Sequence, residues 1–197
     1  MLAPPEYSAR ELSQETWKDF ERFFRKPGEW SSCQCMWFHR PGPRPKEDEA
    51  LTSKERNEKN FREQKALVKG GRSHGVLVFL DGDPVGWCQF GLGEEFPRID
   101  NAAKYRRIPP ASEGARLWRI TCFCVDKRQR KQGIAKLGLR AAMDAIRKEG
   151  GGVVEAYPST RKEGLALHRG TARMFKEEGF EVVAPLGPGN LVVRRKV

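Results

Sequence analysis

One stretch of the chain determines how the rest is interpreted: the apolar run LWRITCFCV at residues 117–125, the basic turn RKQGIA at residues 130–135, and a segment of helical periodicity at residues 134–147. A strand, a glycine-containing turn and a helix in direct succession form a cradle for anions. The first N–H groups of a helix have no intrahelical partner and lie at the positive end of its dipole, so a pyrophosphate can bind there. Gly133 has no Cβ and lets the backbone approach such a ligand closely.

The turn lacks two familiar motifs of phosphate sites. No G-x-x-x-x-G-K-[ST] is present, which disfavours a P-loop nucleotide site, and no G-x-G-x-x-G follows an early strand, which disfavours a Rossmann dinucleotide site. The remaining pattern, R-x-x-G-x-A, starts at Arg130, five residues after Val125. It resembles the acyl-CoA pyrophosphate loop of the GNAT superfamily of N-acetyltransferases, [QR]-x-x-G-x-[GA]. The alternative is an ordinary strand-to-helix turn with exposed basic side chains.

The surrounding elements extend this resemblance. An aromatic-rich strand precedes the turn, an alanine-rich helix follows it, and a second strand is expected at Val153–Tyr157. Further on, FKEEGF at residues 175–180 resembles the Y-x-x-x-G-F ending of the superfamily's last helix. The resemblance covers about Gly75 to Val197. Within the superfamily, the chain is similar to a bacterial group with a Cys-x-Cys-Met segment near the N-terminus and an E-A-Y-P ending to the fifth strand.

The hydrophobic pattern predicts an α/β (α+β) fold, with a mixed, mostly antiparallel central sheet and helices on both faces, as in GNAT proteins. Trp17, Phe20, Phe23 and Phe24 recur at helical spacing, which indicates core rather than a ligand site. Ser53 is expected to cap the second helix alone, because Arg56 stands where a capping box would have Glu. The expected strands are 7–12, 75–80, 84–91, 117–125, 153–157, 180–184 and 190–195, and the expected helices are 15–25, 53–68, 134–147 and 165–178.

Length and composition place limits on the class of protein. With 197 residues, the chain suits one acyl-CoA N-acyltransferase domain, with a helical, acceptor-side part at 1–74 and a CoA-binding core at 75–197. There is no 18-residue apolar run and no secretory signal pattern, so a cytoplasmic enzyme is expected and a membrane partner is not. The five cysteines lack the spacing of a disulfide framework, which fits a reducing compartment.

The formal net charge of +11 attracts polyanions, and both CoA and nucleic acid qualify. The basic residues are spread along the chain, without zinc-finger spacing or an RNP aromatic pattern. We therefore expect much of this charge to be solvated surface and do not expect nucleic acid as a partner.

The resemblance implies how acetyl-CoA would be held. The strand is expected to part from its neighbour, so that backbone groups of Phe123, Cys124 and Val125 pair with the pantetheine amides. An N–H near Val125 would also polarise the thioester carbonyl. The pyrophosphate would be bound by backbone N–H groups and cationic side chains of Arg130, Lys131, Gln132, Gly133, Ile134, Ala135 and Lys136.

The acid and base are less well defined. Many relatives carry a Tyr that protonates the departing thiolate, but this chain has Phe175, which can pack against the cofactor and cannot donate a proton. His168 is expected two helical turns earlier on the same face, where it could bind CoA or act as an acid. Strand alternation puts Glu155 and Tyr157 on one face as a candidate acid–base pair. Alternatively, Glu155 pairs with a surface Arg while Tyr157 packs against Pro158, and ordered water takes the proton.

The cysteines invite a comparison with zinc sites. Cys33 and Cys35 with His39 form a C-x-C pattern, which does not match the usual C-x₂₋₄-C pair, and a closed site needs four ligands. A further ligand would have to come from Cys88, Cys122 or Cys124, so no metal is expected. Cys122 and Cys124 share a strand face, and buried cysteines commonly pack as small apolar residues. Residues 33–39 could instead form an acceptor wall with Trp30, Trp37 and Phe38.

The combined interpretation is an acetyl-CoA-dependent N-acetyltransferase that moves the acetyl group directly to an amine. Two alternatives remain: a catalytically weak relative that senses acyl-CoA, and a basic protein that binds nucleic acid. Glu94, Glu95 and Asp100 in the long insertion at 93–116 could attract a cationic amine, or be solvated. The acceptor amine is not defined by the sequence, and a homodimer is a further expectation because dimers are common in such families.

Overall fold

The computed structural model describes residues 6–26, 33–43, 45–111, 114–160 and 168–197. Its strands form one sheet in the order β1-β2-β3-β4-β5-β7-β6, in which β4 and β5 are parallel and every other neighbouring pair is antiparallel. The predicted mixed, mostly antiparallel sheet is confirmed. The strands are β1 (Tyr7–Glu11), β2 (His74–Leu80), β3 (Asp83–Leu92), β4 (Leu117–Val125), β5 (Val153–Ala156), β6 (Glu181–Pro185) and β7 (Leu191–Lys196).

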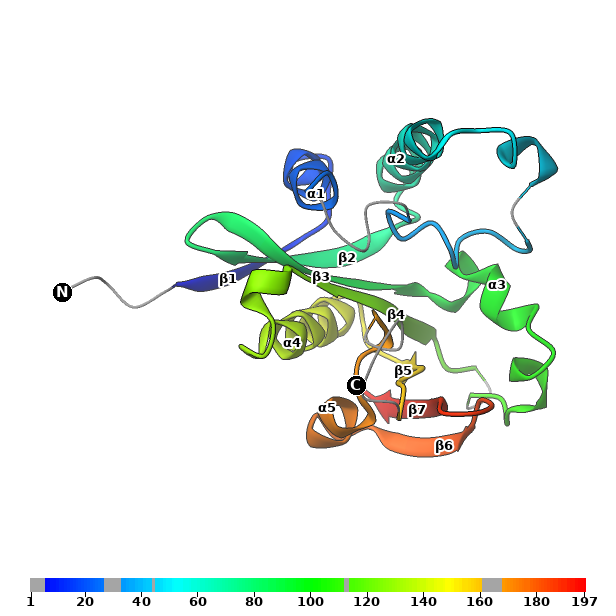
Figure 1. The fold of residues 1–197 in the computed structure, drawn as a ribbon. Coiled ribbons are helices and arrows are strands. Elements are labelled where there is room, and N and C mark those ends of the chain that lie inside the picture. Colours follow the sequence, from blue (N-terminus) through cyan, green and yellow to red (C-terminus); the bar gives the residue numbers. More distant parts are fainter. Residues whose placement is uncertain (1–5, 27–32, 44, 112–113, 161–167) are drawn as a thin grey trace.

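Helices cover both faces of this sheet (Figure 1). On one face lie α1 (Trp17–Phe24) and α2 (Ser53–Lys69), and on the other lie α4 (Ile134–Lys148) and α5 (Ala172–Glu177). The insertion after β3 contains α3 (Pro97–Asp100) and the 3₁₀ turns η2 (Gly93–Glu95) and η3 (Tyr105–Arg107). Two further 3₁₀ turns are η1 (Lys46–Asp48) and η4 (Lys127–Gln129). In the described chain, no helix combines the length and apolar character needed to cross a bilayer.

The aromatic residues of α1 belong to the core, as predicted. Phe20 and Phe24 pack against Trp87 of β3, with ring centroids 5.0 and 6.0 Å apart, and Trp17 meets Phe61 of α2 at 6.5 Å. Burial of such large rings is a main source of stability in a small domain. These contacts therefore hold α1 and α2 on one face of the sheet.

A bulge and a parting of strands interrupt the regular pairing in the middle of the sheet. The register between β3 and β4 shifts so that Gln89 lies opposite Cys122 and Phe90 opposite Ile120, which leaves one extra residue on β4. Parallel pairing of β4 with β5 then stops at Ile120 and Ala156. Beyond that point, β4 is paired with β3 alone among the described strands. The parting that the resemblance implied is present.

The cap of α2 differs from the prediction. Thr52, not Ser53, is the N-cap: its side chain accepts a hydrogen bond from the Glu55 N–H at 3.3 Å, and the Glu55 carboxylate accepts one from the Thr52 N–H at 2.8 Å. This is a complete capping box, which satisfies two N–H groups that the helix itself leaves unpaired. The prediction placed the cap one residue late, so it found Arg56 where Glu55 belongs.

The prediction of the last helix was also wrong at its start. Helix α5 begins at Ala172, after Thr171, whose side chain accepts a hydrogen bond from the Met174 N–H at 3.2 Å. Gly170 has a φ of 72°, a left-handed conformation that interrupts an α-helix. His168 therefore does not share a helical face with Phe175. Residues 165–167 of the predicted helix lie outside the described residues.

Candidate active site

The loop between β4 and α4 has the backbone of an anion site. Lys131 and Gly133 both adopt left-handed conformations, with φ of 65° and 80°. Gly133 is the N-cap of α4 and provides no side-chain hydrogen bond, whereas threonines cap α2 and α5. The space where a Cβ would stand on Gly133 is open to 4 Å. The first N–H groups of α4 are thus left for an external acceptor.

The side chains predicted to hold a pyrophosphate divide into two groups. Ile134 is buried against Val78 and Val85, so it offers only its backbone. Lys136 pairs with Glu177 at 3.0 Å, and this contact, which ties α4 to α5, raises the pKa of Lys136. The remaining predicted residues stay on or near the surface of the loop: Arg130, Lys131, Gln132, Gly133 and Ala135.

The unpaired half of β4 presents backbone rather than side chains to the gap between β4 and β5. Phe123 and Cys124 are buried, and Phe123 packs against Phe175 with ring centroids 6.0 Å apart. Phe175 is itself fully buried, so its side chain lies beneath the strand in the core. His168 reaches the gap by a different route from the one predicted: its Nδ1 lies 3.4 Å from the carbonyl oxygen of Phe123.

A buried ionic row crosses the sheet beside this gap. Arg119 of β4, Glu155 of β5 and Arg194 of β7 are direct neighbours in register. The Nε of Arg194 donates to Glu155 Oε2 at 2.7 Å. The hydroxyls of Tyr157 and Tyr105 donate to Glu155 Oε1 at 2.5 and 2.6 Å. The side chain of Glu155 is fully buried. Protein donors therefore take the place of water at both of its oxygens.

Glu155 has contacts that belong to both sequence interpretations. It accepts a hydrogen bond from Tyr157, its partner in the acid–base hypothesis, and it also pairs with an arginine, Arg194, whose side chain is only 14% exposed. The catalytic roles of Glu155 and Tyr157 stay predictions. Burial, followed by the nearby Glu155 charge, raises the pKa of Tyr157 well above its usual range. Tyr157 consequently holds its proton at neutral pH and is a donor rather than a base.

Sequence reasoning missed the arginine that anchors the insertion. Arg119 is buried, pairs with Asp100 at 2.5 Å and donates to the carbonyl oxygen of Gly93 at 2.7 Å. An arginine in the middle of an apolar strand was the available signal. Asp100 is thus occupied by Arg119. Glu95 pairs with His74 at 3.1 Å and lines a separate cavity of about 680 Å³ together with Glu94.

A cavity of about 400 Å³ opens beside Tyr157. Its lining contains no carboxylate among the described residues. Trp37 and Phe38, predicted for an acceptor wall, do line it, whereas Cys33 and His39 line other cavities and Trp30 lies outside the described residues. Its aromatic side chains are Trp37, Phe38, Tyr105 and Tyr157, and its cations are Arg98, Lys104 and Arg169.

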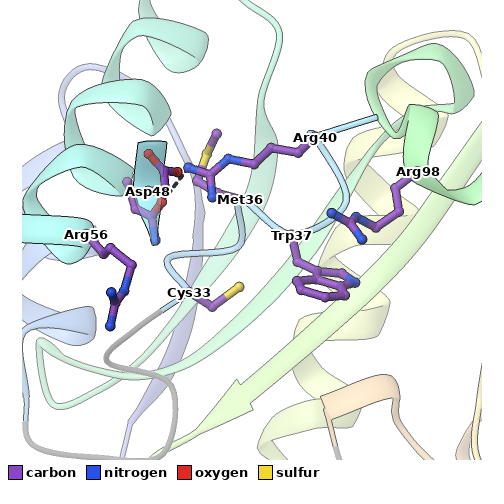
Figure 2. Close-up of a pocket in the computed structure, with 8 residues that line it drawn as sticks. Cys33, Met36, Trp37, Arg40, Asp48, Arg56 and Arg98 are labelled. Atoms are coloured by element: carbon purple, nitrogen blue, oxygen red, sulfur yellow. Dashed lines mark hydrogen bonds between the residues drawn. The ribbon is translucent and has the colours of Figure 1, made fainter. Parts of the chain in front are cut away.

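A second cavity of about 240 Å³ shares Trp37 and Arg98 with the first. Figure 2 shows the Arg98 guanidinium over the Trp37 ring, at 4.0 Å from its centroid. Arg40 and Arg56 add two more cations, against one carboxylate, Asp48, which pairs with Lys59. The Arg98 Nε is buried and has no hydrogen-bond partner in the described part of the chain. The two cavities together form a strongly cationic region.

These features agree with the comparison to known proteins. The model of the acetyltransferase (GNAT) family matches residues 9–169. The chain belongs to this family. A search of the curated proteins found no match. GNAT acetyltransferases use acetyl-CoA and act on amine acceptors.

Solved GNAT structures share the fold over almost the whole chain. One is a GNAT-family protein from Desulfovibrio desulfuricans, with a TM-score of 0.53, 15% identity and coverage of 97% of this chain and 99% of that one. Another is the PaiA N-acetyltransferase from Thermoplasma acidophilum in complex with coenzyme A, with a TM-score of 0.54, 12% identity and coverage of 98% and 99%. At such identities the likeness shows the fold alone.

His39 is a half-buried neutral histidine on the α1–α2 face of this GNAT fold. Its Nδ1 lies 2.9 Å from the carbonyl oxygen of Glu95, and its Nε2 lies 3.1 Å from the Gln89 amide nitrogen. Burial lowers the pKa of His39 to about 4. As pH falls, His39 therefore becomes protonated near pH 6.5 in the unfolded chain but only near pH 4 in the folded chain.

This difference predicts loss of stability in mild acid. Between pH 7 and pH 5, His39 should lower the free energy of unfolding by about 2 kcal/mol, and urea unfolding at both pH values measures it. The His39→Gln variant should show a smaller loss. The His74→Gln variant should show a larger one, because Glu95 raises the pKa of His74 and its stabilisation grows as pH falls. Identical losses in all three proteins would contradict the assignment.

Proposed function

We propose that this GNAT protein transfers an acetyl group from acetyl-CoA directly to an amine that also carries an anionic group. One observation carries the proposal: where β4 and β5 part, β4 leads to the uncapped N-terminus of α4, and β5 leads to Tyr157, which lines the cationic cavity. A thioester lying along the gap would have its phosphates at one end and its acyl group at the other. The five free thiols favour a reducing compartment, for which we propose the cytoplasm.

The donor would be held mainly by backbone. The N–H groups of Ile134, Ala135 and Lys136 open helix α4 and would bind the pyrophosphate, with Arg130 and Lys131 adding charge. Backbone groups of Phe123, Cys124 and Val125 would pair with the pantetheine amides, and an N–H near Val125 would polarise the thioester carbonyl. Gln132 and Gly133 complete the loop. Phe175 would support this strand from the core.

The reaction then needs one nucleophilic attack and two proton movements. The amine nitrogen attacks the carbonyl carbon, the C–S bond breaks, and CoA leaves as a thiolate that takes up a proton. Tyr157 is the proposed acid, because its pKa is raised and it lines the acceptor cavity. Glu155 is the proposed positioning residue, since its oxygens are occupied and shielded from the substrate. His168, beside Phe123, is the alternative acid.

The cationic cavity explains how an amine could be bound without a dedicated base. An amine attacks only when it is unprotonated, and neighbouring positive charges favour the neutral form. Arg98, Lys104 and Arg169 supply those charges and offer N–H donors to a carboxylate or phosphate on the same acceptor. Released protons would then leave through water. A homodimer stays a prediction.

The loop assignment is tested with Gly133→Glu, which should abolish saturable acetyl-CoA binding in calorimetry, because a carboxylate would occupy the place of the pyrophosphate. Gly71→Glu is a matched control: Gly71 also has a positive φ, of 64°, and open space around it, but it precedes β2 on the opposite side of the sheet from α4. The control should bind acetyl-CoA like the original protein. Unchanged binding by the Gly133 variant would overturn the assignment.

The acceptor class is tested by thiol release from acetyl-CoA across amines of matched size that carry a carboxylate, a phosphate or a neutral carboxamide. The anionic acceptors should react best. Replacing Arg169 or Lys104 by Gln should raise KM for them about tenfold, the size expected for one charged hydrogen bond, and should leave KM for the carboxamides unchanged. Equal effects on both kinds of amine would contradict an anionic acceptor. Saturable binding without thiol release from any amine would favour an acyl-CoA sensor.

The acid assignment is tested with Tyr157→Phe, which keeps the ring and removes the proton. Its kcat should fall by about 100-fold, the lower range for general acid catalysis, with KM for acetyl-CoA unchanged. Glu155→Gln should lower kcat and shift the alkaline limb of the pH profile to lower pH. The reason is that the Glu155 charge raises the pKa of Tyr157, and the variant removes this charge. If His168→Ala alone lowers kcat, the acid is His168; if none of the three does, both assignments are wrong.

A further inference from the structure

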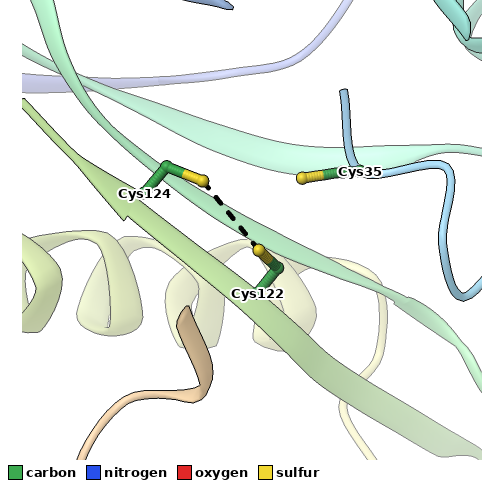
Figure 3. A group of neighbouring side chains, drawn as sticks. All are labelled: Cys35, Cys122 and Cys124. Carbon is green, nitrogen blue, oxygen red and sulfur yellow. Dashed lines mark hydrogen bonds between the residues drawn. The ribbon is translucent and has the colours of Figure 1, made fainter. Parts of the chain in front are cut away.

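Three cysteines from distant parts of the chain meet on the α1–α2 face of the sheet (Figure 3). Cys35 belongs to the segment between α1 and α2, whereas Cys122 and Cys124 lie on β4. Their Sγ atoms all lie within 4.8 Å of one another, and those of Cys122 and Cys124 are 3.9 Å apart. All three are unoxidised; Cys35 and Cys124 are buried, and Cys122 is half-buried.

We propose that Cys35, Cys122 and Cys124 bind one Zn²⁺ ion, which fastens the Cys35 segment to β4. Two thiolates that bind the same zinc ion at 2.3 Å with tetrahedral angles have sulfurs about 3.8 Å apart. The Cys122–Cys124 separation already matches this value, and Cys35 needs only a small approach. Spacing along the chain argued against zinc because C-x-C does not match the usual C-x₂₋₄-C pair and a closed site needs four ligands. The fold brings the two thiols of β4 next to Cys35.

One hydrogen-bond donor next to the cluster suits a metal-bound thiolate. The indole N–H of Trp87 donates to Cys35 Sγ at 3.0 Å, the kind of contact that stabilises a metal-bound sulfur. Three thiols that bind Zn²⁺ release three protons and leave the site with a net charge of −1.

The backbone at Cys35 gives a second, independent observation. Gln34 and Cys35 have φ of 44° and 60°, in the left-handed region that residues with a Cβ rarely occupy. Such strain persists where surrounding bonds hold it. The Gln34 side chain is buried and accepts a hydrogen bond from Asn60 at 3.1 Å. A metal bond from Cys35 would hold the same turn.

Cys33 is the candidate for a fourth ligand, because it lies two residues before Cys35. It is half-buried and lines the cavity of about 240 Å³. Either Cys33 or a water molecule would complete four-coordination.

A zinc ion at this site would position one wall of the cavity beside Tyr157. Cys35 is followed closely by Trp37 and Phe38, which line the cavity beside Tyr157. Fastening Cys35 to β4 next to the parting from β5 would fix that wall relative to the gap. The site does not depend on the proposed acceptor or on the acid assignment.

The first test uses the unaltered full chain. The protein is stripped with a chelator under reducing conditions, loaded with excess Zn²⁺ and passed through gel filtration, and metal is measured by mass spectrometry. We expect one zinc per chain and a higher Tm than in the stripped protein. Loading with Co²⁺ should give thiolate-to-cobalt charge-transfer bands and the visible bands of tetrahedral cobalt. Less than one retained zinc per chain, or cobalt spectra without thiolate bands, would overturn the proposal.

The second test uses single serine variants with a matched control. Cys35→Ser, Cys122→Ser and Cys124→Ser should each lower zinc affinity at least tenfold, measured by competition with a chromophoric chelator. Cys88→Ser should not, because Cys88 is equally buried but lies opposite Phe123 in the sheet register, on the α4 face. If a cluster variant does not fold, the cobalt spectrum of the unaltered protein decides. An equal loss in the Cys88 variant would refute the site.

Discussion

The buried carboxylate of Glu155 is the interaction on which the site depends. A carboxylate in the protein interior is tolerated only when charged and polar partners replace water. Arg194 supplies one set of donors from β7, and the hydroxyls of Tyr105 and Tyr157 supply another. Because Arg119 lies next to Glu155 and pairs with Asp100, the long insertion is drawn onto the same face. One buried charge thus fixes one wall of the cavity beside Tyr157, the end of β5 and the orientation of Tyr157.

The Glu155 carboxylate lies beside the point where β4 and β5 part. A strand that loses one neighbour exposes N–H and C=O groups that require a partner, and a ligand with amide groups can supply it. The network around Glu155 lies one pair before the last paired positions of the two strands, so the proposed chemistry would take place next to the point where the pairing ends. The positive charge at the start of α4 and in the cavity beside Tyr157 suits a phosphate-bearing donor at one end and an anionic acceptor at the other.

Local sequence predicted much of this protein correctly. The R-x-x-G-x-A turn, the aromatic face of α1 and most strands follow from short-range rules, because turn chemistry and hydrophobic periodicity act over a few residues. The errors also have local causes. Ser53 and Thr52 are both good caps, and only the side chain of Glu55 distinguishes them. His168 was placed on a helix by extending periodicity across Gly170, whose left-handed backbone ends that pattern.

The sequence by itself determined the family and the presence of Phe175 where many relatives have tyrosine, and it predicted the phosphate loop, because these depend on residue types at fixed spacing. Only the tertiary structure decided which polar residues act together. The bulge in β4 puts Arg119, Cys122 and Cys124 on one face although their spacing is not that of a regular strand. Glu155 meets partners from the insertion, β4 and β7, and Cys35 meets two thiols almost ninety positions later. These contacts depend on strand register and on the order of strands in the sheet, and neither can be deduced from the spacing of residues along the chain.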